Sequence, residues 1–415
     1  MYSYYCISDH GLREAVFGGN TRDRTLILKK GKEMKFLHLS DLHIGKTVNG
    51  FSMIEEQRSA FDQVLLCVNS EKPDAVVIAG DIYDRAIPSV EAVRLFDEFL
   101  TDLAETNVAV MIISGNHDSP ERLNFARRLL EENRLFIYSV FNGKLGRLSL
   151  SDDYGTVNFW LFPFIKPVSV RNLYAEHEID SYDEAVRVAI ETANIDFSSR
   201  NVLISHQFYT KAGMAALRSE SELVPVGGLD SVPVEYIEGF DYVALGHLHC
   251  SQTVGAERIR YCGSPVKYSF SEWRHDKSIT VVEINEKGSL SVEFFPLYPI
   301  HDMREIKGKI DVLMSGEVSG LEDTEDYLRV ILTDEEEIID PIGKLRSVYP
   351  NIMYLDFENS RTSIDISGIS TDIESVEVLS DYELFCEFFL EVQGSTMSDE
   401  QEAIVRDLLE TEVDV

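Results

Sequence analysis

Apolar runs that stop abruptly at reactive polar side chains recur along this sequence, and they constrain its fold more than any other feature. The run from Val108 to Ile113 is followed, after a glycine, by Asn116, His117 and Asp118. A buried strand reads this way when it carries reactive groups at its carboxyl end. One such motif alone is more often an ordinary polar loop. Four further strand ends repeat it, carrying Asp41 and His43, Asp81, His206, and His247 with His249.

Helical and strand patterns alternate through the first half of the chain. The apolar spacing predicts a helix over 53–70, a strand over 75–79, a helix that Ser89 caps, and a strand over 108–113. A helix that opens at Ser119-Pro120 follows. Such alternation favours an α/β fold in which right-handed crossovers build a largely parallel sheet covered by helices. Further predicted strands cover 157–162, 202–206, 242–245, 259–262, 278–284 and 291–297, and a helix covers 182–193.

The chain has 415 residues, which is too long for one typical core and predicts several domains. We expect residues 1–33 to be a disordered extension or the product of an upstream start, with a genuine extra element as the alternative. The catalytic domain should cover 34–300. A small acidic α/β domain follows over 301–375, with strands near 303, 327 and 352. Two apolar helices are predicted in 376–415, either as part of a core or as a docking surface for a partner helix.

Composition narrows the class of protein. Hydrophobic residues make up 44% of the chain, and no apolar run approaches the roughly 20 residues that a membrane span needs. The five scattered cysteines are typical of reduced thiols in the cytoplasm and favour neither disulfides nor a zinc knuckle. The formal net charge of −34, concentrated after Asp302, argues against strong non-specific DNA binding by this chain alone. It leaves room for a local basic groove or for a partner that supplies the basic surface.

The residues at the strand ends are those of a metal site. In D-x-H and H-x-H spacing both side chains lie on one face of an extended chain. Nitrogen and oxygen ligands without cysteine suit manganese, iron or zinc in a two-metal hydrolytic site. Two metals that share one set of ligands need a bridge, and the carboxylate of Asp81 is the candidate. A hydrogen-bonded Asp and His is the alternative for any one motif taken alone.

The motifs D-x-H, G-D-x-x-D, G-N-H-D, a lone histidine and G-H-x-H occur here in order, and together they resemble the calcineurin-like metallophosphoesterases. The resemblance implies a sandwich of two mixed sheets flanked by helices. It implies one metal on Asp41, His43, Asp81 and His249, and a second on Asp81, Asn116, His206 and His247. It also implies that His117 is the proton donor or transition-state stabiliser, and that Asp84 orients His117 or supports the site.

Two further segments narrow the resemblance to the meiotic-recombination nuclease family. They are Leu37 to Gly45, and Gly263-Ser264-Pro265 followed by Ser269-Phe270-Ser271-Glu272. This implies a manganese-dependent double-strand exonuclease and hairpin endonuclease that acts in DNA repair, recombination and replication. It implies an SMC-like ATPase partner that docks on the terminal helices, a homodimer within a heterotetramer, and a small domain that caps the site. The alternatives are a small-molecule phosphodiesterase or phosphatase with the same metals, and a scaffold with a vestigial site.

Overall fold

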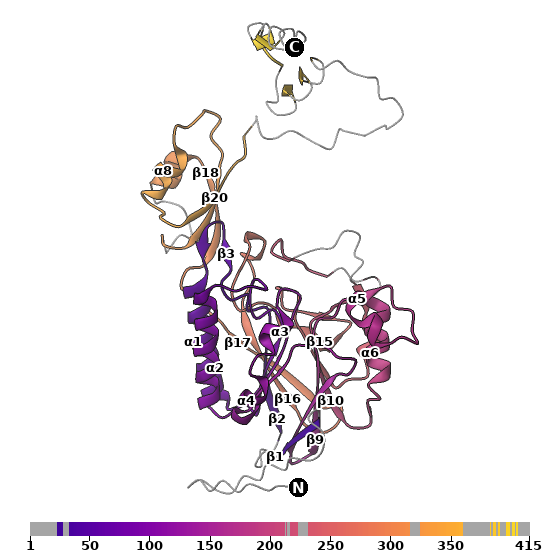
Figure 1. Ribbon diagram of the computed structural model, residues 1–415. Coiled ribbons are helices and arrows are strands. Elements are labelled where there is room, and N and C mark those ends of the chain that lie inside the picture. The colour runs from indigo at the N-terminus through magenta and orange to yellow at the C-terminus, as the bar shows by residue number, and fades with distance from the viewer. Residues whose placement is uncertain are drawn as a thin grey trace. The chain divides into compact units, whose positions relative to one another are not determined.

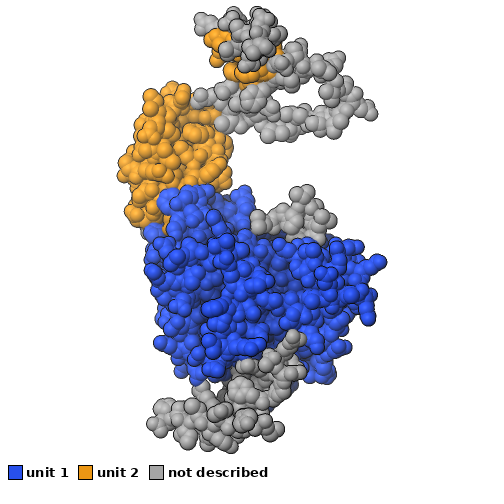
Figure 2. Space-filling model, in the orientation of Figure 1, with its two compact units in different colours: residues 1–302 blue, residues 303–415 orange. Residues whose placement is uncertain are grey.

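The computed structural model describes residues 23–27, 33–211, 213, 216–222, 231–315 and 324–359, with single residues between 382 and 405. The chain divides into two compact units, Met1–Asp302 and Met303–Val415 (Figures 1 and 2). Each is described by itself. The predicted C-terminal helices of 376–415 lie largely outside the described residues.

The first sheet of unit 1 is built mainly from the alternating elements that the sequence predicts. Its strands, in order across the sheet, are β17 (Leu290–Pro296), β16 (Ser278–Ile284), β2 (Met34–Leu39), β5 (Ala75–Ala79), β6 (Ala109–Ile113) and β7 (Leu135–Tyr138). The four strands from β2 to β7 are parallel, and β16 and β17 extend the sheet antiparallel. The helices α1 (Ile54–Glu71) and α2 (Val90–Glu105) form the crossovers between β2, β5 and β6 (Figure 1).

The second sheet is also mixed. Its strands, in order, are β1 (Asp23–Ile27), β8 (Gly146–Asp152), β9 (Gly155–Phe162), β10 (Arg200–Ser205), β13 (Tyr242–Leu245), β15 (Ala256–Tyr261) and β14 (Gln252–Val254). Strands β9, β10, β13 and β15 run parallel, while β8 is antiparallel to β9 and β14 is antiparallel to β15. Within the predicted extension 1–33, Asp23–Ile27 pairs in parallel with β8, and the segment before it lies outside the described residues.

The two sheets pack face to face around a shared apolar core. Phe36 of β2 lies with its ring centroid 5.4 Å from Phe159 of β9 and 5.6 Å from Tyr242 of β13. Because side chains alternate along a strand, Leu37 and Leu39 point to the opposite face, where they pack under α1 and α2. Helix α6 (Tyr182–Thr192) covers the outer face of the second sheet. The predicted α/β sandwich of two mixed sheets flanked by helices is thus confirmed.

Helix ends follow their local chemistry, with one departure. The Ser89 hydroxyl accepts a hydrogen bond from the backbone N–H of Ala92, as an N-cap should. The single helix expected from Ser119-Pro120 is wrong. Ala126 adopts a left-handed backbone with φ of 58°, which divides the segment into α3 (Pro120–Leu123) and α4 (Arg127–Leu130). Propensity favoured a continuous helix, but the local backbone does not allow one.

Unit 2 contains a small parallel sheet in the order β18 (Met303–Gly308), β19 (Tyr327–Leu332) and β20 (Ile352–Phe357). Helices α7 (Ile310–Met314) and α8 (Pro341–Arg346) connect these strands. Its own core includes Leu328, Val330 and Leu345, each fully buried.

The remaining short elements belong to unit 1. They are β3 (Thr47–Val48), β4 (Phe51–Ser52), α5 (Pro167–Val170), β11 (Phe208–Thr210) and β12 (Ser231–Pro233), with 3-10 turns at Glu131–Asn133, Arg171–Leu173, Val234–Ile237 and Phe270–Glu272.

Among the described residues, no helix combines the length and the apolar character needed to cross a bilayer.

The packing of α2 on the first sheet supplies a test of the core. Phe99 is 2% exposed and its ring stacks on Phe61 with centroids 4.4 Å apart. We expect Phe99→Ala to lower the free energy of unfolding by about 3–5 kcal/mol, because it leaves a cavity. Leu66→Ala on the neighbouring helix α1 is the matched control, since Leu66 is 64% exposed. Urea unfolding followed by circular dichroism measures both, and equal effects would contradict this account of the core.

Candidate metal centre

The carboxyl ends of strands from both sheets meet at one buried site. The loops after β2, β5 and β6 and those after β10 and β13 deliver the polar residues that the sequence predicts. Three overlapping groups each have ligand atoms within 4.8 Å of one another. They are Asp41, His43 and His249; His43, Asp81 and His117; and Asp41, Asp81 and His206. The crossover topology therefore joins residues that lie far apart in the sequence.

Unusual backbone conformations hold these residues in place. Asp41, His43, Asp81 and His247 have φ of 53°, 42°, 50° and 105°, which L-residues rarely adopt. Such conformations persist only where the surroundings hold them, and they concentrate at functional sites. Here the N–H of Asp41 donates to the carbonyl of Gly80, and that of His43 to the carbonyl of Asp81, both at 3.0 Å. The two loops therefore support each other.

Two glycines allow the close approach of these loops. A Cβ on Gly80 would lie 2.4 Å from Nδ1 of His206, and the φ of Gly80 is +92°. A Cβ on Gly115 would lie 2.1 Å from Oδ1 of Asp81. Neither distance is sterically possible, so the glycines that precede the motif residues are required by the site itself.

On one side of Asp81, two imidazoles face each other. Nε2 of His43 lies 3.0 Å from Nε2 of His249 and 3.6 Å from Oδ2 of Asp81. Asp41 is fully buried in the same group. These are four side chains that the sequence analysis expects around one metal.

On the other side, His206 and His247 converge on an amide. Oδ1 of Asn116 lies 3.1 Å from both Nε2 of His206 and Nδ1 of His247. Nε2 of His206 is also 3.3 Å from Oδ2 of Asp81. Nδ1 of His206 lies 2.6 Å from the carbonyl oxygen of Ala79, which can only accept, so this nitrogen carries a proton. The second expected group of ligands is therefore also brought together.

Burial and charge set the protonation of these groups. Burial lowers the pKa of His43 well below its usual value and lowers that of His247 to about 3, so both rings are neutral and offer lone pairs. Burial also lowers the pKa of His206, but the carboxylates of Asp81 and Asp41 outweigh it and raise the value to about 9. The site therefore attracts positive charge to Nε2 of His206, as a proton or as a metal ion.

The donor set fits a pair of divalent metals. Carboxylate and amide oxygens, which only accept hydrogen bonds, lie close to imidazole nitrogens that offer a lone pair or an N–H according to tautomer. Buried acceptors that face one another need a cation between them. The residues that would hold it are Asp41, His43, Asp81, Asn116, His206, His247 and His249, and Asp81 lies between the two groups.

His117 lies at the edge of this cluster. Its Nδ1 donates to the backbone carbonyl of Asp84 at 2.9 Å, and its backbone N–H donates to Oδ1 of Asp81, also at 2.9 Å. The Asp84 carboxylate instead pairs with Nζ of Lys46 at 2.9 Å and lies 3.8 Å from Nδ1 of His43. Asp84 thus contacts His117 through its backbone and His43 through its side chain.

Asp118 ties the strand-end loops together. Its carboxylate accepts from the backbone N–H groups of Ile82, Tyr83 and Gly115 at 2.9 to 3.1 Å. Burial raises its pKa to about 6, although these hydrogen bonds oppose the shift. The carboxylate therefore fixes the backbone that positions Asp81.

Sequence reasoning missed a group of residues behind His249. The N–H of His249 donates to Oε1 of Glu222 at 2.7 Å, and Nδ1 lies 2.7 Å from Oγ of Ser221. Glu272 lies beside them, 3.3 Å from the same Nδ1. No spacing in the sequence joins these residues to His249. The Ser269-Phe270-Ser271-Glu272 segment, which carries part of the family resemblance, is the one signal in the sequence that points to Glu272.

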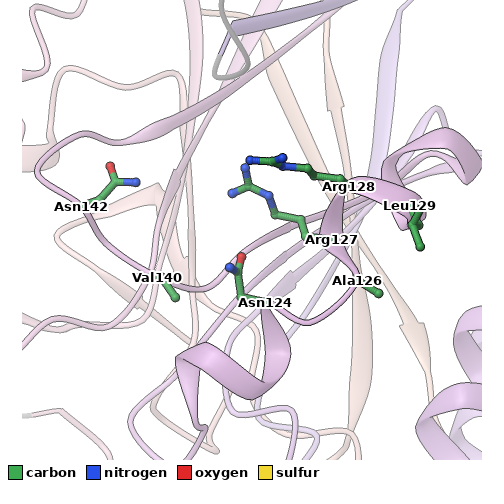
Figure 3. A pocket seen from close by; sticks show the side chains of 7 residues that line it. All are labelled: Asn124, Ala126, Arg127, Arg128, Leu129, Val140 and Asn142. Atoms are coloured by element: carbon green, nitrogen blue, oxygen red, sulfur yellow. The ribbon is translucent and has the colours of Figure 1, made fainter.

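A separate basic pocket is formed by residues that come after the Asn116–Asp118 motif in the sequence. Its volume is about 470 Å³ and it is lined by Asn124, Ala126, Arg127, Arg128, Leu129, Val140 and Asn142. Figure 3 shows the side chains of Arg127 and Arg128 extending into it from α4. Nε of Arg127 lies 3.4 Å from a carboxylate oxygen of Glu131, which balances part of this charge.

The chain matches two family models. Residues 34–251, slightly more than half of the chain, match the calcineurin-like phosphoesterases. Residues 299–393 match a family described as the type 5 capsule protein repressor C-terminal domain. A relative from Staphylococcus epidermidis, named as the D subunit of the nuclease SbcCD, is 34% identical over 325 residues, which cover 78% of this chain and 85% of the relative.

Solved structures that match the chain include a dimetal phosphatase from Danio rerio and the protein TT1561 of Thermus thermophilus. Each is 12% identical and covers 63% of this chain, with 95% and 99% of the other chain covered and TM-scores of 0.39 and 0.37. The family models and the Staphylococcus relative agree with the motif order and the buried donor set. This chain therefore belongs to the calcineurin-like phosphoesterase family and, within it, to the SbcD nuclease subunits, which makes it a phosphodiester hydrolase.

Proposed function

We propose that this chain is the DNA nuclease subunit of an SbcCD-type complex, with double-strand exonuclease and hairpin endonuclease activity in DNA repair, recombination and replication. The observation that carries the proposal is the buried set of nitrogen and oxygen donors at the strand ends of both sheets. The relative from Staphylococcus epidermidis, itself named as part of a nuclease, supports the choice of substrate.

The donor set divides into two metal positions that share Asp81. Asp41, His43 and His249 complete the first, and Asn116, His206 and His247 complete the second. When two divalent ions are bound, which we propose to be Mn²⁺, they supply positive charge to the phosphate and activate a water for attack. The chain contributes rigidity, because the hydrogen bonds of Asp118 hold the backbone of the loops that carry Asp81 and Asn116.

His117 is the proton donor in this proposal. Its Nδ1–H is held by the carbonyl of Asp84, so a second proton on the ring sits at Nε2, and the imidazolium can give that proton to the leaving alkoxide or stabilise charge on the phosphate. Its backbone N–H also binds Asp81, which couples the position of the acid to that of the bridging carboxylate. Asp84 is therefore a positioning residue in this proposal.

DNA binding needs basic surface in a chain with a net charge of −34. The pocket of Arg127 and Arg128 offers such a surface for a phosphodiester backbone. We assign most of the DNA affinity to the assembled complex with an SbcC-type, SMC-like ATPase subunit. We further propose that the small domain over 301–375 caps the site.

Exposed apolar side chains favour a second copy of the chain in that complex. Ile87, just before α2, is 71% exposed, and Val90 and Val93 in its first turn are 75% and 46% exposed. Phe125 and Leu129, at α4, are 82% and 67% exposed. Large exposed apolar groups of this kind mark interaction surfaces. We therefore propose a homodimer within a heterotetramer.

The unpaired cysteines of the described residues suit the reducing cytoplasm, where we place the protein.

A hairpin-DNA assay with Mn²⁺ tests the function, and Asp81→Asn is its inactive control. We expect the wild-type chain with its ATPase partner to cleave hairpin and double-stranded DNA. Asp81→Asn should lose Mn²⁺ binding and cleavage together, because an amide is a poor bridging ligand. Calorimetric Mn²⁺ titration and gel analysis measure the two effects. Hydrolysis of small phosphomonoesters far above DNA cleavage would instead favour a phosphatase.

Substitution of His117 separates acid catalysis from metal binding. His117→Ala should lower the rate of cleavage by roughly 10²–10⁴-fold, since general acids contribute on that scale, while Mn²⁺ binding is retained. His177→Ala is the matched control, because His177 is exposed and distant in sequence from the motifs. If His117→Ala loses Mn²⁺ as well, His117 is a ligand and not the acid.

Truncation before Asp381 tests the docking of the ATPase. We expect the shortened chain to lose association with the SbcC-type subunit and to retain weak nuclease activity, because the donor set lies entirely in unit 1. Co-purification with the ATPase and the hairpin assay measure the two properties. Unchanged association would place the docking surface elsewhere in the chain.

A further inference from the structure

A buried ion pair next to the metal centre has no part in the proposed function so far. The Glu272 carboxylate is fully buried, and its Oε2 lies 2.6 Å from Nζ of Lys277, which is 8% exposed. Two charges are costly to remove from water unless every polar atom around them is satisfied. A hydrophobic pair of similar size would serve packing alone at least as well. Stability alone therefore does not explain why Glu272 and Lys277 are charged.

The partners of this pair surround one predicted ligand, His249. Lys277 donates to the carbonyl oxygen of His249 at 3.0 Å, as well as to the hydroxyl of Ser264 at 2.8 Å. Oε1 of Glu272 accepts from the hydroxyls of Ser219 and Ser221 at 2.7 and 2.8 Å. The negative charge is thus held by donors on all sides and points toward the imidazole of His249.

The numbers of donors and acceptors on Glu272, Ser221 and His249 determine the direction of the hydrogen bonds between them. Oγ of Ser221 lies 2.7 Å from Nδ1 of His249 and 2.8 Å from Oε1 of Glu272. An ionised carboxylate can only accept, so the Ser221 hydroxyl donates its one proton to Glu272. Its oxygen must then accept from Nδ1–H of His249. This leaves Nε2 of His249 as the lone pair, and Nε2 is the atom that faces His43 at 3.0 Å.

The two proposed metal positions differ in this support. Nδ1 of His206 donates to a neutral backbone carbonyl, that of Ala79. His249 is instead backed, through Ser221, by the carboxylate of Glu272, whose other oxygen pairs with Lys277. A carboxylate behind a metal-binding imidazole fixes its tautomer and makes it a stronger donor to the metal. The position that contains His249 should therefore be the tighter one.

We propose that Glu272 is a positioning residue that acts through Ser221 on His249 and makes the metal position of Asp41, His43 and His249 the tighter of the two. This inference rests on the proposed two-metal function. It gives a role to the Ser-Phe-Ser-Glu segment. The hydroxyl of Ser271 accepts from the backbone N–H of Glu220 at 3.0 Å, which fastens this segment to the one that contains Ser221.

Titration of the full-length chain with Mn²⁺ alone tests the proposal. Bound Mn²⁺ is counted by electron paramagnetic resonance, so no DNA and no activity are needed. We expect Glu272→Gln to weaken the tighter of two binding steps by about 10–100-fold and to leave the weaker step unchanged. The matched control is Glu257→Gln, the same substitution at an exposed residue of β15, which should change neither step.

Two further variants keep the test decisive if Glu272→Gln does not fold. The double variant Glu272→Gln with Lys277→Met removes both buried charges, and it should show the same selective loss. Ser221→Ala retains the ion pair and should give a smaller loss, because Oε1 of Glu272 lies 3.3 Å from Nδ1 of His249 and can accept from it directly. Circular dichroism reports whether each variant folds.

The outcomes separate this inference from the proposed function. Equal weakening of both steps would mean that Glu272 supports the fold alone, and no change in either step would also overturn the proposal. Two tight Mn²⁺ sites with the selective loss, but no cleavage of DNA by the wild-type complex, would overturn the nuclease assignment and leave the role of Glu272 intact.

Discussion

The rest of the structure depends on one constraint. The buried side chains of the metal centre must be held within ligand distance of one another although they do not attract one another strongly. Carboxylate and imidazole atoms lie within 4.8 Å of one another in three overlapping groups, and the amide oxygen of Asn116 lies 3.1 Å from two further imidazole nitrogens. Such a cluster collapses or fills with water unless the backbone beneath it is rigid. The sandwich supplies that rigidity, because the strands that carry the ligands are buried on both faces and end at the same edge.

Several kinds of contact support the cluster, from the strands inward to the imidazole rings. The strands set the position of each loop, and Gly80 and Gly115 let the loops approach more closely than any side chain would permit. Asp118 then ties three backbone N–H groups to one carboxylate. Contacts at the outer nitrogens of the imidazoles come last, and they differ among His206, His117 and His249. Two of these rings are held by backbone carbonyls and one by a charged network, so the site is not symmetric.

Charge is distributed to match this arrangement. The chain is strongly acidic. Within the metal centre, the buried carboxylates lie next to histidines. A basic pocket lies on the segment just after the Asn116–Asp118 motif. The acidic excess lies mainly in the last quarter of the chain. A phosphodiester substrate is therefore repelled mainly by that last quarter, and in the proposed complex basic surface from another subunit would offset the repulsion.

The sequence by itself determined the fold class, most strand and helix positions, and which strand-end side chains meet at the buried site. Strand-end motifs are local, and the alternation of strands and helices leaves few topologies. Only the tertiary structure decided how these motifs meet. The break at Ala126, the support of His117 by the carbonyl rather than the carboxylate of Asp84, and the network of Ser221, Glu272 and Lys277 were not readable in advance. Each depends on contacts between distant segments, or on a backbone conformation that its neighbours impose, and spacing along a chain carries no record of either.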